Sequence, residues 1–291
     1  APHGIKLWCL GNEMDGPWQI GNKTARDYGI LAGQTARAMR LVDPDLELVA
    51  CGSSGRGMST FAAWEAEVLE HTYDVVDYVS LHSYYKPQNG DLASFLASAV
   101  DMDAMIEEVT ATCDFVKAKL RRKKKINLSY DEWNVWYSLG EPRPEGVEKW
   151  IEAPHLLEDV YCRLDAVVVG SLLNSLLRHA DRVKMASFAQ LVNVIAPMTT
   201  ENGGPLWKQS TFHPMKLAFQ YGRGDALRLE PTGPMVTTDK YGEVSQLDVT
   251  ATIDDESSEL ALFAVNRSLH DALVLDVDLR ALPGARGIEH I

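Results

Sequence analysis

The chain has 291 residues, of which 46% are hydrophobic, and its formal net charge is −13 at pH 7. This composition is typical of a globular protein with a substantial core, and the length allows one large domain or a large and a small one. The negative charge disfavours nucleic acid or an anionic membrane as a partner and suits a neutral ligand such as a sugar. No apolar stretch approaches the length of a membrane span.

From residue 5 to about residue 221, strand-like runs alternate with helical patterns. The predicted strands are Ile5–Leu10, Leu46–Cys51, Val76–His82, Ile126–Tyr130 and Val183–Val192. The predicted helices are Thr24–Leu41, Thr60–His71, Leu92–Leu120, Pro154–Ala180 and Phe212–Tyr221. Such alternation implies parallel strands joined by right-handed crossovers. An open doubly wound sheet is the competing architecture, but no strand is followed by a glycine-rich phosphate loop of the required spacing.

Beyond about residue 224 the pattern changes to short alternating strands. We predict strands at Leu247–Ile253, Leu260–Val265 and Ala272–Leu279, which favour an antiparallel sandwich-type region. The sequence therefore predicts an α/β fold in two parts, a barrel part over residues 1–224 and part of a β-sandwich over residues 225–291. Five βα units are too few to close an eight-stranded barrel, so the barrel is expected to be partial.

Cysteine and histidine usage gives little reason to expect a metal or a cofactor. The four cysteines are far apart, and no HExxH pair is present among the eight histidines. Cys9 and Cys51 lie inside apolar runs, where buried free thiols are the usual arrangement. This usage favours a reducing, cytoplasmic location.

Two predicted strands end at a carboxylate, Glu13 after the first strand and Glu132 after the fourth. A (β/α) barrel brings the carboxyl ends of its strands to one mouth, where active sites lie. Glycoside hydrolases use a pair of carboxylates in such a mouth to catalyse hydrolysis. For either acid alone, a capping or salt-bridging role is the competing interpretation.

Four strings around these acids occur in order at strand ends. They are Gly11–Gln19 (GNEMDGPWQ), His82–Tyr85 (HSYY), Asp131–Trp136 (DEWNVW) and Ala189–Pro197 (AQLVNVIAP). Together they resemble the α-L-arabinofuranosidases of glycoside hydrolase family 51, over residues 5 to about 221. The resemblance implies that the five strands are strands four to eight of a (β/α)₈ barrel. The first three strands and the sugar-binding residues they carry in the family would lie outside this chain, so we expect the isolated 291 residues to have an incomplete sugar pocket.

By resemblance, Glu13 is the general acid/base and Glu132 the nucleophile of a retaining enzyme. That division of roles predicts a raised pKa for Glu13 while Glu132 stays ionised. Asn12 is expected to bind a sugar hydroxyl, with a turn-holding role as the alternative. Gln190 resembles the family's sugar-hydroxyl ligand at the end of strand eight.

Four further side chains are expected to support the two acids or the sugar. Tyr84 is predicted to hydrogen-bond Glu132, and His82 to position Glu13, although a buried histidine bonded to backbone is the alternative for His82. Trp136 and Trp18 are predicted to offer apolar faces to the sugar ring. For Trp18, a place in the core is an equal alternative.

The resemblance thus implies hydrolysis of terminal α-L-arabinofuranosyl residues from arabinoxylan, arabinan or their oligosaccharides, without cofactor or metal. Partners would be arabinose-containing glycans rather than nucleic acid or membrane, and the family implies a homo-oligomer, a hexamer. Rival interpretations are another retaining glycosidase, such as a β-xylosidase or endo-glucanase, and a catalytically incomplete sugar-binding module. A generic α/β scaffold would require four coincidental motifs.

Overall fold

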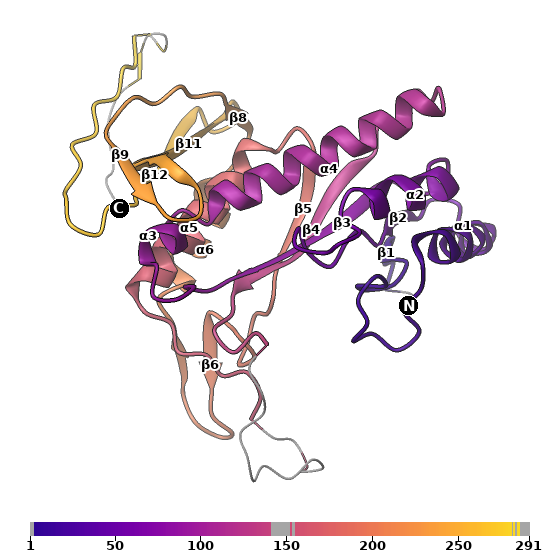
Figure 1. Cartoon of the computed structure of the whole chain (residues 1–291). Helices are drawn as coiled ribbons and strands as arrows, with labels where there is room; N and C mark the ends of the chain where they lie inside the picture. Colours follow the sequence, from indigo (N-terminus) through magenta and orange to yellow (C-terminus); the bar gives the residue numbers. More distant parts are fainter. Residues whose placement is uncertain (1–2, 141–151, 153–154, 281, 283, 286–291) are drawn as a thin grey trace.

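A computed structural model of the chain describes residues 3–140, 152, 155–280, 282, 284 and 285. Its centre is a five-stranded parallel sheet in the order β1-β2-β3-β4-β5 (Figure 1). The strands are β1 (Leu7–Cys9), β2 (Glu47–Ala50), β3 (Tyr78–Tyr85), β4 (Asn127–Val135) and β5 (Val183–Phe188). Each strand pairs with the next one along the chain, as in a (β/α) barrel that is not closed. The predicted partial barrel is therefore confirmed.

Helices connect successive strands and bury their apolar sides with the sheet in one core. They are α1 (Ala25–Val42), α2 (Ala63–Thr72), α3 (Leu92–Leu96), α4 (Ala99–Lys119) and α5 (Arg163–Arg178), with α6 (Phe212–Tyr221) after the last barrel strand. The middle strands β3 and β4 are buried on both faces, as the consecutive buried pairs Val79 with Ser80 and Leu128 with Ser129 show. Such strands are typical of sheets covered on both sides.

Two predicted helices begin or end differently in the structure. The pattern over Leu92–Leu120 forms two helices, because the chain turns at Ala97 and the Ser98 hydroxyl donates to the carbonyl of Phe95 instead of continuing the first helix. The helix predicted from Pro154 begins at Arg163, where the side chain of Asp165 accepts from the amide of Cys162 and caps the helix. Pro154 itself lies outside the described residues.

The two outer strands of the described sheet are open edges. On β1, Leu7 is 40% exposed and Trp8 46% exposed, although both are large apolar side chains in a strand. In β5, only Val183 is buried. Among the described residues, no strand bridges β1 and β5, so one side of the barrel mouth is open.

After β5 the chain leaves the sheet earlier than predicted. The strand predicted to run to Val192 ends at Phe188, because the following loop turns back onto β4, where Asn134 donates to the carbonyls of Ala189 and Ile195, both at 2.5 Å. A hairpin that the sequence did not indicate then follows, formed by β6 (Met198–Thr200) and β7 (Leu206–Lys208).

The C-terminal part is antiparallel, as predicted. Strands β8 (Asp225–Leu227), β11 (Leu247–Asp254) and β12 (Glu259–Asn266) form one sheet, and β9 (Met235–Thr238) pairs with β10 (Gly242–Ser245). The first sheet packs against α5, where Arg178 pairs with Asp248 at 2.6 Å. The division at residue 224 stays a prediction.

The strand predicted at Ala272–Leu279 is wrong, since these residues form no strand. Val274 is 88% exposed and Val277 50% exposed. The alternating apolar pattern indicated a half-buried strand, but no described strand edge pairs with this segment. None of the helices in the described part of the chain has both the length and the apolar content that a membrane span needs.

Candidate active site

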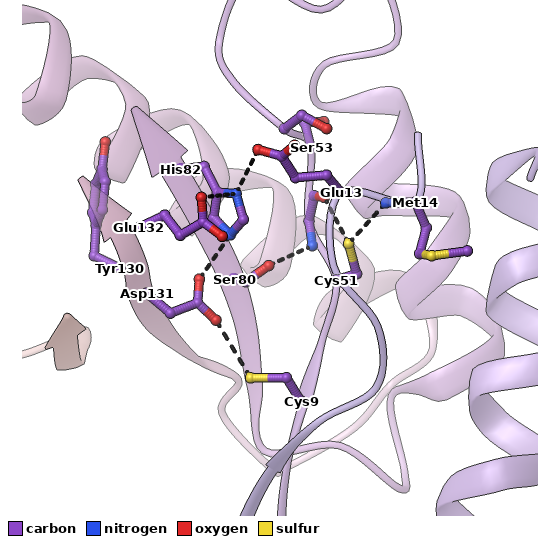
Figure 2. A network of polar contacts seen from close by, with 12 residues as sticks. Cys9, Glu13, Met14, Cys51, Ser53, Ser80, His82, Tyr130, Asp131 and Glu132 are labelled. Carbon is purple, nitrogen blue, oxygen red and sulfur yellow. Dashed lines mark hydrogen bonds and ion pairs between the residues drawn. The ribbon is translucent and has the colours of Figure 1, made fainter. Parts of the chain in front are cut away.

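The structure brings the two predicted glutamates together, although β4 continues past the predicted end at Tyr130 to Val135 and so includes Glu132. Glu13 follows β1 and Glu132 lies in β4, and the side chain of His82 from β3 stands between them (Figure 2). One carboxylate oxygen of each glutamate and a ring nitrogen of His82 lie within 4.8 Å of one another. Glu13 is 14% exposed at its side chain and Glu132 29%, so both can meet a ligand from the mouth.

His82 is surrounded by three carboxylates. Its Nδ1 lies 3.0 Å from Glu13 Oε1 and 3.6 Å from Glu132 Oε2, and its Nε2 lies 3.0 Å from Asp131 Oδ1. Burial alone lowers the pKa of His82, but the bonds to Asp131 and Glu13 and the charge of Glu132 outweigh it and raise the pKa to about 10. The ring is therefore an imidazolium at neutral pH. The alternative of a buried histidine bonded to backbone is wrong.

A β-bulge in β4 makes this arrangement possible. Relative to β3, Ser129 pairs with Ser80 and Glu132 with His82, so β4 carries one more residue than its neighbour in this interval. The register against β5 shifts at the same place. Successive residues of a regular strand point to opposite faces, and a bulge re-aims them. Because of it, Asp131 and Glu132 both reach His82.

Asp131 is a site residue that the sequence reasoning missed. It belongs to the string Asp131–Trp136 that carries the family resemblance. In a regular strand, however, neighbouring residues point to opposite faces, so Asp131 was expected on the face opposite to Glu132. Its other oxygen, Oδ2, accepts from the Cys9 thiol of β1 at 3.5 Å. Burial and the charge of Asp131 raise the pKa of Cys9 to about 12, so Cys9 stays a thiol.

The expectation of a raised pKa for Glu13 is wrong for the site as it stands. Burial raises the pKa of Glu13. The hydrogen bonds from His82 and Trp18, together with the charge of His82, have a larger effect in the opposite direction, so the pKa of Glu13 is below its ordinary value. The Trp18 indole donates to Glu13 Oε2 at 2.6 Å. The site's extra proton thus resides on His82, next to Glu13.

The loop after β1 holds Glu13 in an unusual backbone conformation. Its φ of +47° lies in the left-handed region that a side chain rarely adopts, and such conformations cluster at functional sites. Further along, the Trp18 ring folds over Gly16, where an added Cβ would lie 2.4 Å from Trp18 Cε2. The core alternative for Trp18 is wrong, because this residue is 57% exposed; contact with sugar stays a prediction.

Tyr84 and Trp136 flank the second glutamate. The hydroxyl of Tyr84 donates to Glu132 Oε2 at 2.8 Å, as predicted. Burial, followed by the charge of Glu132, raises the pKa of Tyr84, so its hydroxyl stays a donor. The rings of Tyr84 and Trp136 meet edge to face at 4.9 Å, and Trp136 Nε1 donates to Ser138 Oγ at 2.9 Å.

The two predicted sugar-hydroxyl ligands lie at the ends of the two outermost strands. Asn12 directly precedes Glu13, and Gln190 follows β5; both are exposed. No hydrogen bond joins either side chain to Glu13 or Glu132 among the described contacts. Their contact with a sugar stays a prediction.

Glu13, His82 and Glu132 have the spacing of a metal-binding group, and they form the single such group among the described residues. The residues do not fit a resident cation, because the charged imidazole already occupies the space between the carboxylates. A proton on His82 supplies the positive charge that a metal would bring.

Comparison with known proteins shows the family of the chain. Residues 131–291, more than half of the chain, match the model of the α-L-arabinofuranosidase C-terminal domain, and residues 7–157 match that of glycosyl hydrolases family 39. A solved family 51 α-L-arabinofuranosidase from Bifidobacterium longum superimposes with a TM-score of 0.86 at 45% identity, over 91% of this chain and 54% of that one. The chain belongs to the family 51 α-L-arabinofuranosidases.

The curated relatives that the chain matches are longer than the chain itself. An intracellular exo-α-(1→5)-L-arabinofuranosidase from Streptomyces lividans is 59% identical over 99% of this chain and 44% of its own length. An exo-α-(1→6)-L-arabinofuranosidase from Bifidobacterium longum is 52% identical over 93% of this chain and 53% of its own length. The chain therefore spans about half the length of the curated relatives it matches.

Proposed function

We propose that this arabinofuranosidase chain carries the catalytic acids of an enzyme that removes terminal α-L-arabinofuranosyl residues with retention of configuration. The observation that carries the proposal is the close approach of the two glutamates: His82 Nδ1 lies 3.0 Å from an oxygen of Glu13 and 3.6 Å from one of Glu132, and one oxygen of each glutamate lies within 4.8 Å of the other. Retaining glycosidases hold their carboxyl groups about 5–5.5 Å apart, whereas inverting enzymes need about 6.5–9.5 Å to admit a water. The narrower spacing favours direct attack by Glu132 on the anomeric carbon.

In the first step, Glu132 forms an ester bond to the anomeric carbon while the glycosidic C–O bond breaks. The departing oxygen takes the proton of the carboxyl form of Glu13, which ends the step as a carboxylate, and His82 Nδ1, 3.0 Å from Glu13 Oε1, keeps its own proton and donates to that carboxylate. The Tyr84 hydroxyl, which donates to Glu132 Oε2, keeps Glu132 oriented until the attack.

In the second step, water attacks the anomeric carbon and Glu132 leaves as a carboxylate. Because the ester has removed one negative charge from the site, Glu13 is more easily ionised at this stage and accepts the proton of the attacking water. The free sugar keeps its original anomeric configuration after two inversions.

The substrate class rests on the relatives. Their names specify exo-acting α-(1→5) and α-(1→6) enzymes, so we assign the terminal arabinofuranosyl unit, which the two kinds of enzyme share. Intracellular action, as in the names of several relatives, and a hexameric assembly belong to the same proposal.

The test uses the full-length protein on a panel of aryl glycosides, comprising the α-L-arabinofuranoside, the β-D-xyloside and a β-cellobioside. We expect hydrolysis of the arabinofuranoside, with the α-anomer as the first product seen by proton NMR. Preference for the xyloside or cellobioside would instead support the rival glycosidases. Binding of arabino-oligosaccharides in calorimetry without turnover would identify a sugar-binding module.

A further inference from the structure

Asp131 connects three strands of the sheet next to the two glutamates. It belongs to β4, its Oδ1 lies 3.0 Å from Nε2 of His82 on β3, and its Oδ2 accepts from Cys9 on β1 at 3.5 Å (Figure 2). The Asp131 side chain is 19% exposed and that of His82 3%. Asp131 Oδ1 is itself buried and faces the far nitrogen of the imidazole, on the side of the ring opposite to Glu13 and Glu132.

This contact depends on the bulge. Without the extra residue in β4, Asp131 and Glu132 would point to opposite faces of the sheet, and only one of them could reach His82. The bulge interrupts regular pairing with both neighbouring strands. Bulges beside active sites re-aim a side chain, and here the side chain that gains a partner is Asp131.

We propose that Asp131 is a positioning residue for the acid/base Glu13: its Oδ1, paired with Nε2 of His82 at 3.0 Å, attracts that side of the charged ring and thereby holds Nδ1 and its proton facing Glu13. The proposal rests on the role of Glu13 given under the proposed function. Which nitrogen of a histidine carries the working proton is set by the bond that the other nitrogen makes. A carboxylate on Nε2 both orients the ring and stabilises its charged form.

The charged groups that face His82 are Glu13 from the loop after β1, and Asp131 and Glu132 from β4. Glu13 and Glu132 change charge during the reaction, whereas Asp131 does not. Asp131 is therefore the constant partner that keeps the imidazole protonated when Glu132 becomes an ester. Cys9, with its pKa raised, remains a neutral donor to Asp131 over this range.

The test is Asp131→Asn in the full-length protein, read by ¹⁵N NMR of histidine-labelled protein. We expect the pKa of His82 to fall by about 1–3 pH units, the size of effect of one adjacent opposite charge. The basic limb of kcat/KM on an aryl α-L-arabinofuranoside should move to lower pH in parallel. The matched control is Asp15→Asn in the same mouth: Asp15 accepts from Ser54, not from His82, so the His82 titration should keep its wild-type position.

An unchanged His82 titration in Asp131→Asn would overturn the proposal, whatever the activity. Conversely, a wild-type protein that does not hydrolyse the arabinofuranoside would refute the proposed function, while the NMR titration would still decide the role of Asp131. Should Asp131→Asn fail to fold, Asp131→Glu serves instead, because it keeps the charge and moves it by one methylene. It should leave His82 cationic but shift its Nε2 signal; a wild-type Nε2 signal would overturn the proposal.

Discussion

Removing one hydroxyl from the site tests how the nucleophile is held. Tyr84→Phe deletes the donor that lies 2.8 Å from Glu132 Oε2 and keeps the ring that packs edge to face on Trp136. A hydrogen bond to a charged group contributes about 1.5–3 kcal/mol. Each factor of ten in rate corresponds to about 1.4 kcal/mol, so the loss should be about 10- to 150-fold.

The loss should fall mainly on the second step, because negative charge returns to Glu132 when the ester is hydrolysed. With an activated aryl α-L-arabinofuranoside, Tyr84→Phe is therefore expected to lower kcat more than kcat/KM, and to release a burst of phenol before a slow steady state. Stopped-flow absorbance measures both phases.

The matched control is the adjacent residue of β3. Tyr85 is buried at 7% exposure on the other face of the strand, so Tyr85→Phe makes the same chemical change away from the glutamates. It should keep wild-type kinetics. Equal rates and no burst difference between the two variants would refute the reasoning about Tyr84.

Three further predictions concern the loop, the imidazolium and the buried amide. Gly16→Ala should push the Trp18 ring off Glu13, because the new Cβ would lie 2.4 Å from that ring; we expect an activity loss of about tenfold or more with a changed tryptophan emission, and unchanged values for both would contradict it. His82 has a raised pKa of about 10, so its stabilisation is complete below its ordinary pKa of 6.5 and is lost as pH rises through 10. Thermal unfolding should show a decline of up to about 5 kcal/mol over that window, and His82→Gln should abolish the decline. Asn134→Ala leaves the buried carbonyl of Ala189 without a donor, while that of Ile195 keeps only the amide of Gln190. It should cost about 1–3 kcal/mol in urea unfolding, whereas a cost within error would refute the packing role.

The two catalytic candidates were predictable from sequence because each follows an apolar run that a barrel brings to its mouth. Asp131 was not predictable as a site residue, because its orientation depends on one extra residue in β4, and no local sequence pattern indicates that bulge. The pKa of Glu13 was mispredicted for a related reason. Its value is set by His82 and Trp18, one of which comes from a strand about seventy residues away, and burial alone points in the opposite direction.

At the level of the fold, the alternation of strands and helices was sufficient for the parallel sheet and the antiparallel part. The same rule failed at Ala272–Leu279, where an apolar alternation has no strand edge to pair with among the described residues. It also missed the end of β5, because the turn there is fixed by the side chain of Asn134 rather than by glycine or proline.

The central claim is that Glu132 is the nucleophile and Glu13 its acid/base. In a Glu13→Ala variant of the full-length protein, an aryl α-L-arabinofuranoside with a good leaving group should load the enzyme, because departure then needs no proton while hydrolysis lacks its base. Mass spectrometry of the digested protein should find one arabinosyl group on the peptide that contains Glu132. Label on another residue, or no label under conditions where phenol is released, would contradict the account.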